Sequence, residues 1–201
     1  MTKPLIFVLS SLLGLLMATA CNSAGETAAP TPVPSPTLLV AAERKSLPTP
    51  LSPGQKIVYD DLQVTMKESE ITTSYITEYG SDRESTTADK KFIWIRLLLR
   101  NIGQDERTLP ETEHFSVIYG TDEFKSTYGH RKDHTDYTSL NTNMATRQEI
   151  DAWLRFDIPA TAELQELWFA FLPESSRVSF GFSSSEYFWA DHPIYLWNCA
   201  P

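Results

Sequence analysis

The residue types best suited to metal chemistry lie in one short charged segment, residues 129–136, which reads GHRKDHTD. Its candidate ligands are two histidines four residues apart and two nearby aspartates: His130, His134, Asp133 and Asp136. Imidazole nitrogens and carboxylate oxygens are ligands that Zn²⁺ accepts. The surrounding residues predict a loop, however, and Arg131 and Lys132 add positive charge that opposes a cation. We therefore interpret the segment as a solvated charged loop, keep a metal site as the alternative, and expect no cofactor.

Paired carboxylates are the other groups that could do acid–base chemistry. There are three such pairs: Asp60–Asp61, Glu111 with Glu113, and Asp122–Glu123. A glycosidase needs two carboxylates facing each other across a cleft, whereas neighbours on a strand point to opposite faces. We therefore predict exposed turn and strand-end acids, and structural roles for the isolated His114 and His192. No Gly-x-Ser-x-Gly elbow occurs, and no spacing supports a Ser-His-Asp triad, although the sequence leaves one open. The expectation is a non-enzyme with no catalytic residues.

The N-terminus carries an export signal. Residues 1–21 read MTKPLIFVLSSLLGLLMATAC, with Lys3 before an apolar run too short to span a bilayer. Small residues precede Cys21, and this layout resembles the lipobox of bacterial lipoproteins. The resemblance implies that Cys21 is lipidated, with acyl chains such as palmitate, and becomes the first mature residue. Ala18 stands where that family most often has Leu, and A-x-A also suits ordinary secretory cleavage, so plain secretion is the alternative.

A single further cysteine, Cys199, follows close to the C-terminus. If Cys21 is lipidated, Cys199 is unpaired, and we expect a partly buried thiol beside Trp197 without chemistry of its own. The alternative is a Cys21–Cys199 disulfide, which would close a loop of almost the whole chain.

Residues 21–53 form a linker. The stretch after Cys21 contains seven prolines among Ala, Thr and Ser, and no aromatic residue occurs between Phe7 and Tyr59. Such a segment cannot bury a core and favours extended polyproline conformations, so we interpret it as a stalk, with a proline-rich docking ligand as the alternative.

The folded part is predicted as one domain, residues 54–201, which holds all five tryptophans and all eight tyrosines. Its apolar residues alternate with a period of two, as in Leu62–Met66 and Phe92–Arg100, where Ile93, Ile95, Leu97 and Leu99 form the buried face. Further strands are expected at Phe115–Tyr119, Leu154–Ile158, Leu167–Phe171 and Val178–Phe182, and a short helical connector at 160–166. This pattern predicts an all-β, antiparallel β-sandwich.

Two long polar segments, Glu68–Lys91 and Gly120–Glu149, interrupt the strands. We expect hairpin excursions or loops at one end of the sandwich, where such domains usually carry function. The C-terminal segment 183–201 is rich in aromatic residues: Tyr187, Phe188, Trp189, Tyr195 and Trp197. We expect it to pack as an additional edge strand, with an exposed binding patch as the alternative.

Several of these residues resemble a known family. The segments KFIWIRLLLRNIG, TLPETEHFSVIYGTDEFKSTYG, LRFDIP and LQELWFAF resemble the telokin-like, immunoglobulin-like domains of unknown function found in bacterial and archaeal lipoproteins. The shared features are the Asn101-Ile102-Gly103 turn, Phe115 opening a strand, and the Phe156–Pro159 strand end. The match covers roughly 54–182 and leaves 183–201 as an extra segment. The resemblance implies an immunoglobulin-like β-sandwich and assigns no activity.

Organisation and charge then indicate a function class. The formal net charge of −9 argues against nucleic acid as a partner. Signal peptide (1–20), lipidated cysteine, linker and domain together predict a lipoprotein of the cell envelope, anchored to the membrane on its extracytoplasmic face. We expect a non-catalytic binding or accessory module for an envelope protein or glycan. The alternative is an extracytoplasmic hydrolase, or a metal-binding domain, that uses the long polar loops.

Overall fold

A computed structural model describes residues 48–85, 87–174 and 192–201. The predicted signal peptide, Cys21 and most of the linker lie outside these residues. So do the strand expected at Val178–Phe182 and the aromatic residues Tyr187, Phe188 and Trp189. No helix among the described residues is long and apolar enough to cross a membrane.

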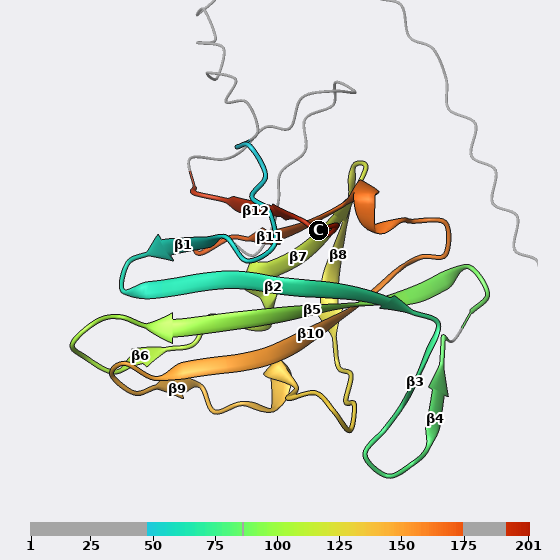
Figure 1. Ribbon diagram of the computed structural model, residues 1–201, viewed down its shortest axis with the longest axis horizontal. Coiled ribbons are helices and arrows are strands. Elements are labelled where there is room, and N and C mark those ends of the chain that lie inside the picture. Colours follow the sequence, from blue (N-terminus) through green and yellow to red (C-terminus); the bar gives the residue numbers. More distant parts are fainter. Residues whose placement is uncertain (1–47, 86, 175–191) are drawn as a thin grey trace, which may run out of the picture. The chain divides into compact units, whose positions relative to one another are not determined.

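Strands make up nearly all the regular structure in the described part of the chain (Figure 1). In chain order they are β1 (Lys56–Tyr59), β2 (Leu62–Thr72), β3 (Ser74–Ile76), β4 (Asp82–Glu84), β5 (Lys90–Asn101), β6 (Arg107–Thr108), β7 (Phe115–Tyr119), β8 (Asp122–Thr127), β9 (Asn143–Met144), β10 (Glu149–Pro159), β11 (Leu167–Phe171) and β12 (Tyr195–Asn198). Three 3₁₀ turns join them: η1 (Thr112–His114), η2 (Tyr137–Ser139) and η3 (Leu164–Glu166). The predicted all-β class is confirmed, and η3 lies within the connector expected at 160–166.

Eight strands form one continuous sheet in the order β1-β2-β5-β10-β8-β7-β11-β12, and all its strand pairings are antiparallel. β8 joins the two halves, because it pairs with β7 and also meets β10 at Phe156 and Arg155. Leu51, just before β1, forms a bridge to Trp197 of β12 at the other end of the strand order. The two layers expected for a sandwich are therefore halves of one sheet that closes almost completely on itself.

The core lies between these two halves. Ile93, Ile95, Leu97 and Leu99 of β5 are fully buried, as predicted, and they share one apolar cluster with residues of β7, β10 and β11. Phe115 stacks on Phe169, with ring centroids 5.9 Å apart. Burial of this apolar surface is the main term that stabilises the fold. No disulfide adds to it among the described residues, because the one described cysteine, Cys199, is a free thiol.

The Asn-x-Gly turn after β5 has a structural explanation. The buried Asn101 accepts a hydrogen bond from the Gly103 N–H through Oδ1, at 3.0 Å, and donates through Nδ2 to the Asp105 carbonyl, at 2.8 Å. A Cβ on Gly103 would lie 2.7 Å from an Asp61 carboxylate oxygen. The turn therefore needs both an amide side chain and a glycine, for reasons of packing and not of catalysis.

The described end of the C-terminal segment packs, as expected. β12 pairs with β11, Trp197 is fully buried, and its Nε1–H donates to the Gln55 carbonyl at 2.9 Å. Cys199 is also buried, and burial raises the pKa of its thiol well above the ordinary value. A thiol held neutral in the core is not a nucleophile.

Candidate functional site

The two long polar segments contact each other on the outer face of β2, β5 and β10. From the first segment, β3 and β4 form a hairpin that projects from the end of β2 (Figure 1). From the second, the loop 128–136 runs along β10, where the Trp153 N–H donates to the Thr135 carbonyl at 2.8 Å. Segments far apart in the sequence thus meet at one place, as expected for loops that build a site.

Both faces of β5 are buried where these segments cover it. The alternating pattern predicted a single buried face, yet Phe92 is 4% exposed and Trp94 1% exposed on the outer side. The prediction was wrong here because the hairpin and the loop form a second cover over the sheet. Trp94 keeps a polar contact in this position, since its Nε1–H donates to Thr72 Oγ1 at 3.0 Å.

Aromatic rings and cations alternate under this second cover. His134 stacks on Trp153, with centroids 3.9 Å apart, and meets Trp94 edge to face at 5.5 Å. The Arg131 guanidinium lies over the Trp94 ring at 5.3 Å, and that of Arg96 lies 5.9 Å from Trp153. Such cation–π and aromatic contacts bind the loop to the sheet.

The predicted metal ligands are separated by this packing. The His134 side chain is only 6% exposed, and burial lowers its pKa, with the Arg131 charge adding to the effect. His130 instead faces the hairpin, with Nε2 3.1 Å from Glu78 Oε2 but without the alignment of a hydrogen bond. No group of three or more His, Cys, Asp or Glu side chains within the described ranges is placed to hold a metal ion.

The two aspartates of the segment have structural partners. Asp136 is buried and caps η2, accepting hydrogen bonds from the Thr138 N–H at 3.0 Å and hydroxyl at 2.8 Å. Asp133 accepts from Arg131 at 3.2 and 3.3 Å. Partial burial alone would raise the pKa of Asp133, but the hydrogen bonds from Arg131 and its own backbone lower it. The solvated-loop interpretation therefore misses how firmly this segment is packed.

The remaining candidate acids and histidines lie elsewhere. Asp60–Asp61 occupies the β1–β2 turn, Glu111 and Glu113 flank the start of η1, and Asp122–Glu123 opens β8. His114 Nδ1 contacts the Leu172 carbonyl at 2.7 Å, and His192 Nδ1 contacts Glu174 at 3.1 Å. None of these residues lines the two pockets of the outer face.

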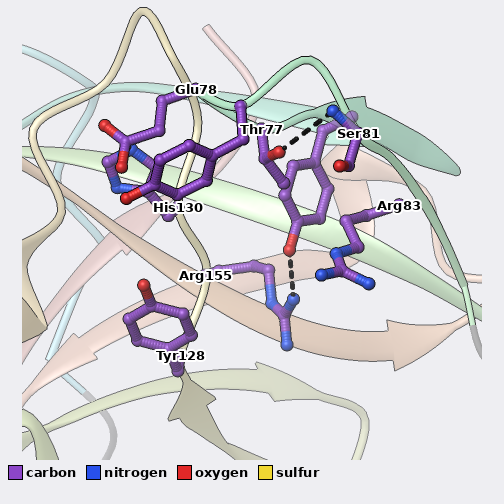
Figure 2. Close-up of a pocket in the computed structure, with 9 residues that line it drawn as sticks. Thr77, Glu78, Ser81, Arg83, Tyr128, His130 and Arg155 are labelled. Carbon is purple, nitrogen blue, oxygen red and sulfur yellow. Dashed lines mark hydrogen bonds and ion pairs between the residues drawn. The ribbon is translucent and has the colours of Figure 1, made fainter.

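A pocket of about 400 Å³ opens between the β3–β4 hairpin and residues 128–130; we call it the tyrosine pocket. Its aromatic wall consists of Tyr75, Tyr79 and Tyr128, and its other ionisable groups are Glu78, Arg83, His130 and Arg155. Figure 2 shows Glu78 and His130 together at one end and Arg83 at the other, with Tyr128, the residue after β8, across from the hairpin. A second hollow, about 620 Å³, lies on the other side of Tyr75 and includes Glu70 and Arg131.

Local hairpin geometry places the pocket residues. Tyr75 of β3 and Arg83 of β4 are directly opposite each other, so their side chains share one face. The Gly80 N–H donates to the Thr77 carbonyl at 3.0 Å and Gly80 has φ +72°, a conformation that suits glycine. This tight turn holds Glu78 and Tyr79 at the hairpin tip.

Arg155 is the fixed part of the pocket. Its side chain is 14% exposed, its Nε and Nη2 donate to Thr127 Oγ1 at 3.1 and 2.8 Å, and its Nη1 donates to the Tyr75 hydroxyl at 3.1 Å. Asp157 lies 3.4 Å away and offsets the charge. A Cβ at Gly129 would lie 2.6 Å from Arg155 Cδ, so the loop passes here only with glycine.

The pocket brings together a carboxylate of the hairpin tip and two exposed rings, one on the same tip and one just after β8. A hydrogen bond from Tyr79 and the nearby His130 lower the pKa of Glu78, and the same hydrogen bond raises the pKa of Tyr79. Tyr79 is 86% exposed and Tyr128 68% exposed. Sequence reasoning missed these tyrosines, although single aromatic residues inside polar stretches, as in TTSYITEYGS, were a signal that could have revealed them.

Comparison with known proteins places the chain in a family. Residues 52–175 match the profile of a domain of unknown function, DUF4352, which covers more than half of the chain. The chain belongs to the DUF4352 family. The DUF4352 match ends at residue 175, before the aromatic C-terminal segment, and it includes every residue of the tyrosine pocket. No curated protein matches the chain closely enough to count as a relative.

Solved structures resemble this DUF4352 protein at low sequence identity. The yjhA protein of Bacillus subtilis is 13% identical with a TM-score of 0.50, covering 74% of this chain and 98% of that one. An uncharacterized β-sandwich protein from Clostridium difficile is 12% identical with a TM-score of 0.45, covering 77% and 96%. A candidate lipoprotein of Bacillus subtilis, ycdA, is 14% identical with a TM-score of 0.45; the match covers 75% of this chain but only 40% of that protein.

Proposed function

We propose that this DUF4352 protein is a lipid-anchored, extracytoplasmic binding module that takes its ligand in the tyrosine pocket. The single observation that carries the proposal is the pocket itself, built where the two long insertions meet. Rings of Tyr79 and Tyr128 stand exposed in this pocket, and its far end holds Arg83, for whose guanidinium no hydrogen bond or ion pair is found among the described residues (Figure 2). Exposed tyrosines offer large, rigid and amphipathic contact surface at low entropic cost, as in protein recognition sites.

The anchor, the stalk and the immunoglobulin-like fold belong to the same proposal. Cys21 follows a lipobox-like segment, and the proline-rich linker after it would hold the domain away from the membrane surface. Two facing halves of an antiparallel sheet, with function in insertions between strands, fit an immunoglobulin-like binding domain.

Footprinting tests the pocket without knowledge of the ligand. The full chain is oxidised by hydroxyl radicals, once in intact cell envelopes and once after purification, and modification is read by mass spectrometry. We expect Tyr79 and Tyr128 to be protected in envelopes, while the exposed Val58 and Ile102 react equally in both samples. Equal reactivity of the two tyrosines in both samples would contradict the proposal.

Metabolic labelling with an alkyne fatty acid tests the anchor. We expect the label on the wild-type chain and on a Cys199→Ala variant, because that thiol is buried in the core. The Cys21→Ala variant should carry no label and appear in the soluble fraction. Label retained on Cys21→Ala would refute the lipid anchor and favour plain secretion.

A hydrolase is the second candidate, favoured by the His130–Glu78 contact inside the pocket. A His–carboxylate pair activates a nucleophile only when the second ring nitrogen reaches it. Ser81 and Thr77 line the same pocket, but among the described residues they bond to each other. The Ser81 N–H donates to Thr77 Oγ1 at 3.3 Å (Figure 2). Turnover of a bound ligand that is lost in His130→Ala would support the hydrolase over the non-catalytic module.

A further inference from the structure

The chemistry of the tyrosine pocket narrows the class of ligand. We infer that the pocket binds an anionic sugar unit, whose C–H face packs on Tyr79 and Tyr128 and whose carboxylate or phosphate is held by Arg83. This inference rests on the proposed function, since it requires the tyrosine pocket to be the binding site.

The lining excludes a purely apolar ligand. None of the nine residues around the pocket has an aliphatic or phenylalanine side chain; besides the three tyrosines they are Thr77, Ser81, Glu78, His130 and the two arginines. The phenol rings therefore provide the principal apolar surface, and polar groups surround them. A sugar ring has the matching character, because it combines an apolar C–H face with a rim of hydroxyl groups, and aromatic rings accept C–H groups on their electron-rich faces.

The charges select an anion. Arg155 already has Asp157, Thr127 and Tyr75 as partners, and Glu78 has His130 and Tyr79. Arg83 is exposed, and its guanidinium has no ion pair or hydrogen bond with the described residues. Its planar fork suits the two oxygens of a carboxylate or phosphate.

The two ends of the pocket orient the ligand. Glu78 is ionised at neutral pH, because its pKa is lowered, and so it repels an anionic group while accepting hydrogen bonds from hydroxyls. Arg83 lies at the opposite end (Figure 2). The acidic substituent is therefore held at the Arg83 end, and sugar hydroxyls point toward Glu78 and His130. The volume of about 400 Å³ falls in the range of small-molecule sites, which suits one or two sugar rings better than a long segment.

Calorimetric titration of the full chain in a zwitterionic detergent without sugar groups tests the inference. Four probes distinguish the contribution of the sugar ring to affinity from that of the negative charge: digalacturonate, maltose 1-phosphate, neutral maltose, and citrate as an anion without a sugar ring. We expect at least one anionic sugar to bind about tenfold more tightly than maltose and citrate. Binding of digalacturonate alone identifies a uronic acid, and binding of maltose 1-phosphate alone identifies a phosphosugar; both outcomes support the inference.

Matched variants assign the contacts. Arg83→Gln should reduce the affinity for the anionic sugar about tenfold, to the level of maltose, and remove its dependence on salt. Tyr128→Ala should weaken the anionic and the neutral sugar together. Arg100→Gln, which removes another exposed arginine away from the pocket, should change nothing.

Three outcomes would overturn the inference: no probe binds, maltose or citrate binds as tightly as the anionic sugars, or Arg83→Gln has no effect. Each can occur while Tyr79 and Tyr128 remain protected in cell envelopes, in which case the pocket binds another class of ligand and the proposed function stands. Absence of protection would remove the proposed function as well, so the two failures are distinguishable.

Discussion

Both faces of β5 are buried, but the side chains that cover them differ in chemical character. On the inner face, four aliphatic residues pack against apolar residues from the other half of the sheet. On the outer face, Trp94 lies under Tyr75, His134 and Arg131 from the two insertions, and the neighbouring Arg96 pairs with carboxylates of β2 and β10. Burial alone stabilises the apolar side chains of the inner face, whereas the stability of the contacts on the outer face also depends on charge and hydration. Stability therefore resides mainly on the inner face, and the outer face is where contacts with a ligand can form.

Deletion of residues 194–201 should give the largest effect, because it breaks the inner face. The segment contributes Leu196, Trp197 and Cys199 to the apolar clusters. At ~1.5–3 kcal/mol for each large buried side chain, the loss is comparable with the whole stability of a typical domain. We expect no cooperative thermal transition by circular dichroism. Trp197→Phe, which keeps an aromatic ring there, should still unfold cooperatively, and a deletion variant with the wild-type melting temperature would refute the packing role.

Adjacent residues on β5 compare the two faces directly. Leu97→Ala on the inner face should lower the free energy of unfolding by about 2–5 kcal/mol, as for other fully buried leucines. Arg96→Gln on the outer face should cost less than about 1 kcal/mol, although Arg96 is 2.8 Å from Glu68 and 2.7 Å from Asp151, because the group is 36% exposed. Urea denaturation of both variants measures the difference. Equal costs would mean that the outer cover is as essential to the fold as the core.

Acidification should weaken the outer face selectively. Burial lowers the pKa of His134, so the unfolded chain binds more protons than the folded chain below about pH 6.5, and stability falls as the pH decreases through that value. We expect the melting temperature to drop by a few degrees between pH 7 and pH 5.5. His134→Phe keeps a ring stacked on Trp153 and should flatten this pH dependence. The carboxylates with lowered pKa values, such as Glu174, act only at more acidic pH.

Sequence reasoning succeeded where a simple period governs the structure. Alternation located the inner face of β5 and most of the strands, and the aromatic content of the C-terminal segment indicated the packing that β12 shows. The same alternation failed to predict the burial of Phe92 and Trp94. The side chains that cover them come from segments remote in the chain, which a local pattern does not show. The tyrosine pocket was missed for that reason: Arg83 pairs with Tyr75 in the hairpin, and Arg155 of β10 reaches the same Tyr75 through a side-chain hydrogen bond, contacts that no spacing in the sequence records.

Tyr128→Ala should give the smallest effect on stability and still separate the two faces most clearly. The ring is 68% exposed, so its removal should change the free energy of unfolding by no more than about 0.5 kcal/mol. If the outer face carries binding, the same variant loses affinity for the pocket ligand, and position 79 loses its protection in cell envelopes. Val58→Ala, also exposed but distant from the pocket, should change neither quantity. A binding surface differs from a second core in having residues that contribute little to stability but much to binding. Unchanged protection at position 79 in Tyr128→Ala would mean that the outer face acts as a second core and not as a binding surface.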